Sequence, residues 1–117
     1  MSIHRIATGP RMSQAVVHKH TIYLAGQVAS KAAGASVSEQ TREILGQIDA
    51  LLAEAGSDKT HILATTIYLA DISTFAEMNA VWEAWVAPGH TPARATVEAK
   101  LAAPPYTVEI VVIAAKP

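Results

Sequence analysis

Residues 91–114, which read TPARATVEAKLAAPPYTVEIVVIA, carry the pattern that decides the fold. β-branched and apolar residues fill Ala95 to Leu101 and Tyr106 to Ala114, so we expect both to be strands. Two prolines between them, in Ala102 to Pro105, force a connection. We expect the two strands to pair as a hairpin around this connection, which would place antiparallel pairing at the end of the chain.

Two short strands and a helix come first in the chain. β-branched and apolar residues fill Ala15 to His18 and Thr21 to Ala25. The polar pair Lys19-His20 between these two strands predicts a tight hairpin. A first helix follows, which Ser36 or Ser38 can cap and which Gly56 can end. Its apolar positions recur at helical spacing: Ile44, Leu45, Ile48, Leu51, Leu52 and Ala55.

A further strand and a second helix lead to the C-terminal stretch. Ile62 to Ala70 favours a pleated strand, and Thr74 with Glu77 forms a capping-box pattern for a helix that Pro88-Gly89 ends. The apolar side of that helix comprises Phe75, Met78, Trp82, Trp85 and Val86. This order predicts a single domain over residues 1–117, with a two-layer α+β fold and a largely antiparallel sheet.

Composition narrows the possible functions. The chain has 117 residues, is 50% hydrophobic, carries a net charge of -1 and contains no cysteine. Disulfides, thiolate metal sites and a cysteine nucleophile are therefore excluded, and the charge argues against a nucleic-acid partner. Met1 to Pro10 has no apolar leader and no stretch suits a membrane span, so we expect a cytoplasmic protein. The apolar excess of so short a chain predicts subunit association.

Arg94 follows Thr91-Pro92-Ala93 at the start of a predicted strand, with no acid in the four residues before it. Its guanidinium is a permanent cation whose planar fork of donors matches a carboxylate. The alternative is a structural arginine that binds backbone carbonyls or forms a surface ion pair.

Glu109 interrupts the apolar run Val108 to Ile113. Such a carboxylate either faces solvent or is partly buried, where it would suit proton transfer. In a hairpin whose paired residue numbers sum to 205 or 207, Glu109 lies opposite Thr96 or Glu98 and shares a face with Arg94. The two side chains would then be about 7 to 13 Å apart, a gap that one small carboxylate could bridge. An even sum would put them on opposite faces.

Other motifs give no competing site. His18 and His20 alone share a local face, and two histidines do not make a metal site. The glycines form no nucleotide-binding loop and the serines no hydrolase elbow. Trp82 and Trp85 fit a core or an interface. We therefore predict no metal and no cofactor.

The chain resembles the RidA/YjgF family, also known as the endoribonuclease L-PSP family, over nearly its whole length. Pro92-Ala93-Arg94 and Val108-Glu109-Ile110 are the most specific matches. The other matches are Gly9-Pro10, Ser13 to Val16, Tyr23 to Val28, Gln40 to Arg42, Ala55-Gly56, Tyr68 to Asp71 and Phe75 to Asn79. The resemblance implies a chorismate-mutase-like α+β subunit, with a largely antiparallel six-strand-type sheet packed by two helices. It also implies a barrel-like homotrimer with ligand clefts between neighbouring subunits.

The resemblance also implies a reaction, the hydrolysis of enamine and imine intermediates from pyridoxal-phosphate enzymes to 2-oxo acids and ammonia. Arg94 is similar to the family arginine that grips the substrate carboxylate, and Glu109 to the acid that positions the attacking water. Asn79 is similar to an asparagine of the cleft. A non-catalytic trimer that senses a small carboxylate is the alternative.

Three cleft positions depart from the family pattern. Met12 stands in place of a tyrosine, Ala25 in place of a serine and Thr96 in place of a cysteine. These substitutions imply a more apolar substrate pocket and a divergent branch of the family.

Overall fold

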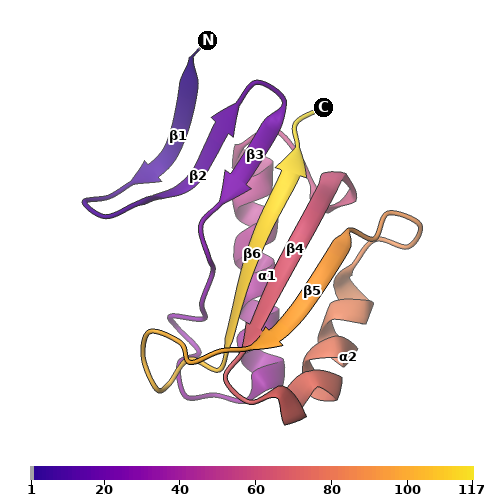
Figure 1. The fold of residues 1–117 in the computed structure, drawn as a ribbon. Coiled ribbons are helices and arrows are strands. Elements are labelled where there is room, and N and C mark those ends of the chain that lie inside the picture. The colour runs from indigo at the N-terminus through magenta and orange to yellow at the C-terminus, as the bar shows by residue number, and fades with distance from the viewer. Residues whose placement is uncertain (1) are drawn as a thin grey trace.

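The computed structural model describes residues 2–117 as one six-stranded sheet with two helices against one of its faces (Figure 1). The strands are β1 (Ile3–Thr8), β2 (Ser13–His18), β3 (Thr21–Leu24), β4 (Ile62–Leu69), β5 (Ala93–Glu98) and β6 (Val108–Ala115). The helices are α1 (Val37–Glu54) and α2 (Phe75–Trp85). A short 3-10 turn, η1 (Lys59–His61), precedes β4, and another, η2 (Ile72–Thr74), precedes α2. The α+β class is confirmed, and every neighbouring pair of strands is antiparallel except β4 with β5.

The predicted local signals around the first hairpin and α1 are confirmed. Lys19 takes a positive φ of 57° in the turn between β2 and β3. The Ser36 side chain accepts a hydrogen bond from the Glu39 N–H at the start of α1, and Gly56 follows the helix with a φ of +85°. Each of these features depends on residues close in sequence, which is why the sequence reveals them.

β1 is an element that the sequence did not predict. It pairs antiparallel with β2 at the edge of the sheet, and of its six residues only Ile6 is buried. A strand that buries one side chain has no apolar alternation to recognise.

The predicted hairpin between the last two strands is wrong. The strand order is β1-β2-β3-β6-β4-β5, so β4 lies between β5 and β6. β5 runs parallel to β4, because α2 carries the chain back across the sheet between these two strands. β6 then pairs antiparallel with both β4 and β3. The sequence pattern that indicates this parallel crossover is a strand followed by a helix and then by a second strand.

The predicted capping box at α2 is also not formed. Thr74 makes no side-chain hydrogen bond to the helix, and its hydroxyl donates to the Asp71 carbonyl at 2.7 Å. The Glu77 carboxylate instead accepts from the N–H and hydroxyl of Ser38, both at 3.0 Å. Glu77 therefore satisfies donors at the start of α1 and ties the two helices together.

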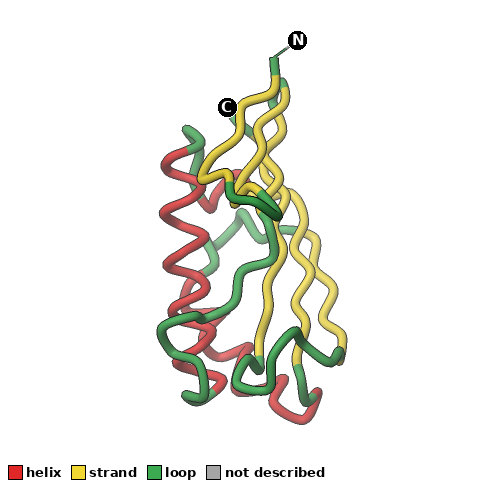
Figure 2. The backbone as a smooth tube through the Cα atoms, turned by 90° about the vertical axis from the view of Figure 1, so that its left-hand side faces the viewer, coloured by secondary structure: helices red, strands yellow, loops and turns green. Residues whose placement is uncertain are grey.

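Both helices lie on the same side of the sheet, as the side view shows (Figure 2). The side chains beneath them form the core, and the largest fully buried ones include Ile22, Ile44, Leu45, Ile48, Leu52, Ile67, Leu69, Met78 and Ile110. We call this side the covered face and the other the open face. On the open face Tyr23 and Val97 are 46% and 43% exposed. Within residues 2–117, neither helix is long and apolar enough to cross a membrane.

Candidate functional site

Arg94 lies on the covered face, at the edge of the sheet. It is the second residue of β5 and is directly opposite Thr65 of β4. Thr65 is only 3% exposed and points into the helix layer, so Arg94 points the same way. The edge position keeps Arg94 half-buried rather than enclosed.

Three side chains of α2 hold the Arg94 guanidinium. Its Nη1 donates to the Asn79 Oδ1 at 2.7 Å. Its central carbon lies 5.6 Å from the centroid of the Phe75 ring and 5.5 Å from that of Trp82. These distances place the cation on two aromatic rings, an arrangement that stabilises a guanidinium without neutralising it.

Arg94 has no carboxylate partner within residues 2–117. Among residues 2–117 the only ion pair joins His61 and Asp58, and the only side-chain acceptor for Arg94 is the neutral amide of Asn79. The contacts of Arg94 therefore do not fit the structural alternative, in which this arginine binds backbone carbonyls or an acid. A half-buried cation with unused donors is suited to an anionic ligand.

Two buried hydroxyls lie on the same side of the sheet. Thr65 is opposite Arg94, and Thr96 is two residues further along β5. In residues 2–117 neither hydroxyl oxygen has a hydrogen-bond partner, although both are shielded from solvent. We call Arg94, Asn79, Thr96, Phe75 and Trp82 the Arg94 group.

Glu109 lies on the open face. It is opposite Tyr68 of β4, and it alternates with the buried Val108 and Ile110 along β6. A Cβ atom added to Gly26 would collide with the Glu109 carboxylate, so the carboxylate rests against the backbone where β3 has ended. Only glycine allows this approach.

A buried network of glutamine amides fixes the segment beside Glu109. The Gln27 side chain donates to the Gln14 Oε1 and to the Ala25 carbonyl, both at 3.0 Å, and accepts from the Gln47 Nε2 at 3.0 Å. The Gln27 backbone also exchanges two hydrogen bonds with Ile110, at 2.9 and 3.1 Å. Because Ile110 follows Glu109, this pairing holds the carboxylate in register with Gly26. We call Glu109, Ala25, Gly26 and Tyr68 the Glu109 group.

The prediction that Arg94 and Glu109 share a face is wrong. Arg94 is opposite Thr65 and Glu109 is opposite Tyr68, three residues apart on the same strand. Side chains alternate along a strand, so these two positions point to opposite faces. The error follows from the hairpin, which would have set Glu109 opposite Thr96 or Glu98 rather than opposite β4.

The remaining candidate residues divide between the two groups. Asn79 contacts Arg94, and Thr96 shares its face. Ala25 immediately precedes Gly26, beside Glu109. Met12 lies apart from both, in the loop between β1 and β2, and is 53% exposed. A hollow of about 290 Å³ lies beside Glu109 and Tyr68.

Sequence reasoning identified neither Gly26 nor Gln27 as a site residue. Both lie in the stretch Tyr23 to Val28 that matches the RidA/YjgF pattern. An isolated glycine directly after a predicted strand indicates that another group approaches the backbone closely, and this signal could have identified Gly26.

Comparisons with known proteins agree with the fold and with the motifs. Residues 2–116 match the family described as Endoribonuclease L-PSP. A RutC family protein of Haemophilus influenzae is 47% identical over 114 residues, covering 97% of this chain and 98% of that protein. The 2-iminobutanoate/2-iminopropanoate deaminase of Rattus norvegicus is 32% identical, covering 87% and 77%. A crystal structure of a YjgF family member from Neisseria meningitidis matches with a TM-score of 0.96 and 50% identity, covering 100% of this chain and 97% of that one.

Proposed function

Because the chain belongs to the endoribonuclease L-PSP family, the family of the YjgF proteins, we propose that it hydrolyses 2-imino acids to 2-oxo acids and ammonia. The substrates would be the enamine and imine intermediates that pyridoxal-phosphate enzymes release. The name of the rat relative supports this reaction class. The observation that carries the proposal is the half-buried Arg94 guanidinium, which pairs with no acid in the described part of the chain.

Arg94 would bind the substrate carboxylate. Asn79 occupies one of its N–H groups, and the rings of Phe75 and Trp82 limit its movement. The remaining donors can form a two-point contact with a carboxylate, which sets the orientation of the adjacent imine carbon. A guanidinium already held in place loses little side-chain entropy on binding.

The complete site would form between subunits. Arg94 and Glu109 point to opposite faces of one chain, so one pocket can contain both only if two chains contribute. In a homotrimer, the Arg94 group of one subunit would face the Glu109 group of its neighbour. The exposed apolar side chains Tyr23 and Val97 on the open face support such association.

The chemistry requires one water and one base. Glu109 would accept a hydrogen bond from the water and take its proton as the water oxygen attacks the imine carbon. Glu109 passes this proton to the imine nitrogen, which gives a tetrahedral amino alcohol. Glu109 then takes the hydroxyl proton of this intermediate and delivers it to the amine nitrogen as the C–N bond breaks, so that ammonia leaves and the carbonyl forms. An imine carbon is already activated, so orientation and charge neutralisation suffice without a cofactor or metal.

Three positions would tune substrate choice. Met12, Ala25 and Thr96 stand where the family pattern has a tyrosine, a serine and a cysteine. With two fewer polar groups, the cleft would favour imino acids with apolar side chains. Met12 is exposed in the isolated chain, so it can line the cleft only if a neighbouring subunit lies against it.

The decisive experiment is a coupled assay. An amino-acid oxidase generates imines from a panel of amino acids, and imine loss is followed with and without this protein. Faster loss, greatest for apolar side chains, supports the proposal. No acceleration for any imine in the panel contradicts it.

A carboxylate sensor without catalysis is the second candidate. It is favoured by one observation, that the Arg94 group is complete within one chain and contains no general base. Binding of 2-oxo acids without imine hydrolysis would support it. The nuclease activity in the family's description is not favoured, because a net charge of -1 gives little attraction to a phosphate backbone.

A further inference from the structure

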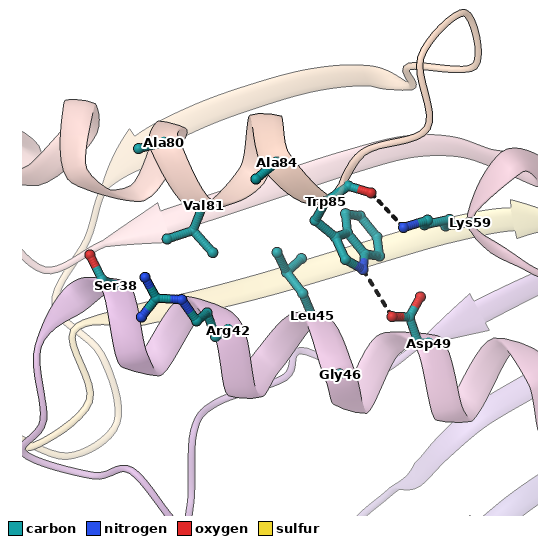
Figure 3. Close-up of a pocket in the computed structure, with 10 residues that line it drawn as sticks. All are labelled: Ser38, Arg42, Leu45, Gly46, Asp49, Lys59, Ala80, Val81, Ala84 and Trp85. Atoms are coloured by element: carbon teal, nitrogen blue, oxygen red, sulfur yellow. Dashed lines mark hydrogen bonds between the residues drawn. The ribbon is translucent and has the colours of Figure 1, made fainter.

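A groove separates α1 from α2 on the side of the helix layer that faces away from the sheet (Figure 3). Its volume is about 490 Å³, within the range of small-molecule sites. No residue of the Arg94 group or of the Glu109 group lines the groove. The nearest link is the contact between Trp82, of the Arg94 group, and Trp85, which lines it. The groove would stay accessible in an assembly that buries the open face of the sheet.

Trp85 forms a fixed aromatic wall at one end of the groove. Its indole N–H donates to the Asp49 Oδ2 at 2.9 Å, and its ring centroid lies 5.4 Å from that of Trp82. The Lys59 ammonium donates to the Trp85 carbonyl at 2.6 Å and lies 5.1 Å from the ring centroid. Figure 3 shows both hydrogen bonds. A ring held at three points needs no reordering to receive a ligand.

Small residues keep the groove open. Gly46 of α1 and Ala80 and Ala84 of α2 line its sides. A Cβ atom added to Gly46 would meet nothing within 4 Å, so there is free space directly above the helix backbone. A flat apolar group could therefore lie between the helices beside Leu45 and Val81, where larger side chains would exclude it.

Arg42 supplies an unpaired cation at the other end. In residues 2–117 its guanidinium has no hydrogen-bond acceptor and no ion pair, and Figure 3 shows it within the groove toward Ser38. Two carboxylates beside the groove already have partners, since Glu77 binds Ser38 and Asp49 binds Trp85. The lining holds two cations and one carboxylate, which favours an anion.

We propose that this groove is a second ligand site, which binds a small aromatic carboxylate with its ring against Trp85 and its carboxylate on Arg42. Arg42 and Asp49, the partner of Trp85, are separated by about 10 Å of helix. A phenyl ring joined to a carboxylate through two methylene groups, as in 3-phenylpropanoate, matches such a span. The site does not depend on the proposed deaminase activity.

The test is a titration of the ¹⁵N-labelled protein with 3-phenylpropanoate, followed through the indole N–H resonances. The chain has two tryptophans, and Trp85→Phe identifies the Trp85 signal. That signal should shift in a saturable manner, with a dissociation constant on the order of 1 mM for so small a ligand. The neutral amide of the same acid should bind at least about tenfold more weakly, because it lacks the charge.

Variants separate this site from the proposed substrate site, which also binds carboxylates. Arg42→Ala should weaken binding about tenfold, and Ala84→Leu should abolish it by filling the groove. Arg94→Ala and the exposed control Arg5→Ala should leave the Trp85 shift unchanged. The proposal is overturned if about 10 mM probe gives no Trp85 shift, or if Arg94→Ala removes the shift while Arg42→Ala keeps it. A shift that follows protein concentration instead of probe would mean that a second copy of the chain covers the groove.

Discussion

The Arg94 group and the Glu109 group occupy opposite faces of one sheet and are held in place by different means. Side chains of one helix hold Arg94: an amide and two aromatic rings of α2. Backbone holds Glu109, which rests on Gly26 and is kept in register by the paired backbones of Gln27 and Ile110. Side chains of α2 therefore limit the movement of the Arg94 guanidinium itself, whereas strand pairing fixes the backbone beside Glu109. The position of the guanidinium thus depends on α2, and that of the carboxylate on the absence of a side chain at Gly26.

The largest effect expected from this division is on the rate of hydrolysis. Glu109→Gln keeps the shape of the side chain and removes the base, so imine hydrolysis should slow by about 10² to 10⁴. Affinity for a product-like 2-oxo acid should stay similar, because Arg94 is unchanged. Steady-state kinetics and calorimetric titration measure the two quantities. Equal rates for wild type and variant would assign the protein to the sensor class.

Arg94 should show the converse behaviour. Arg94→Ala leaves the ligand carboxylate unpaired in a partly dehydrated cleft and should weaken 2-oxo acid binding by roughly 2 to 5 kcal/mol. Arg94→Lys should restore only part of this affinity, since an ammonium cannot form the two-point contact. Calorimetric titration of all three proteins gives the comparison, with Arg5→Ala as the matched control. If Arg94→Ala binds as tightly as wild type, the Arg94 group has no ligand role.

The close approach of the Glu109 carboxylate to Gly26 can be tested by substitution of this glycine. A methyl group there collides with the carboxylate, so Gly26→Ala should displace Glu109 and lower the hydrolysis rate by about 10- to 100-fold. Gly46→Ala is the control, because its added Cβ meets nothing within 4 Å. Rates of the two variants, with circular dichroism to verify folding, measure the difference. A Gly26→Ala enzyme as active as the control would show that the close approach has no catalytic role.

The proposed homotrimer predicts a molecular mass in solution that is three times the mass of one chain. Light scattering at micromolar concentration should give three times the chain mass of 12.3 kDa. Val97→Asp places a charge on the open face, where Val97 is 43% exposed in the single chain, and should shift the mass toward one chain with loss of activity. The control Ala50→Asp, which adds the same charge at an exposed residue of α1, should leave the mass unchanged. A wild-type monomer that is active would contradict a site built from two chains.

The smallest effect concerns the turn before α2, the helix that holds Arg94. The hydroxyl of Ser73 and then its backbone N–H donate to the Asp71 carboxylate and lower its pKa below the usual 3.8. Asp71 therefore contributes stability above the unfolded-state pKa, and this contribution is lost as the pH falls through the lower folded-state pKa. Ser73→Ala should raise the Asp71 pKa toward its usual value. The free energy of unfolding should then fall less steeply as the pH is lowered through this range. Carboxyl NMR titration and urea unfolding between pH 2 and pH 6 are the measurements, and an unchanged Asp71 pKa in Ser73→Ala would contradict the assignment.

Much of the fold could be predicted because it depends on short-range patterns. The hairpin of β2 and β3, the cap at Ser36 and the positive φ at Gly56 involve residues within a few positions of one another. The capping box at Thr74 followed equally good local rules and failed, since Glu77 found the donors of Ser38 on the other helix. A local pattern identifies a group that can bond, but it does not identify which partner the folded chain offers.

By itself the sequence determined the α+β class and most of the elements, and it identified Arg94 as a candidate because no acid stands in the four residues before it. Tertiary structure alone decided that β4 enters between β5 and β6, and this placement put Arg94 and Glu109 on opposite faces. It also decided that the Glu109 carboxylate rests on Gly26, a residue far away in the chain. The physical reason is that strand pairing depends on how the whole sheet buries its apolar side chains, and a shift of one position in register reverses every side chain along a strand.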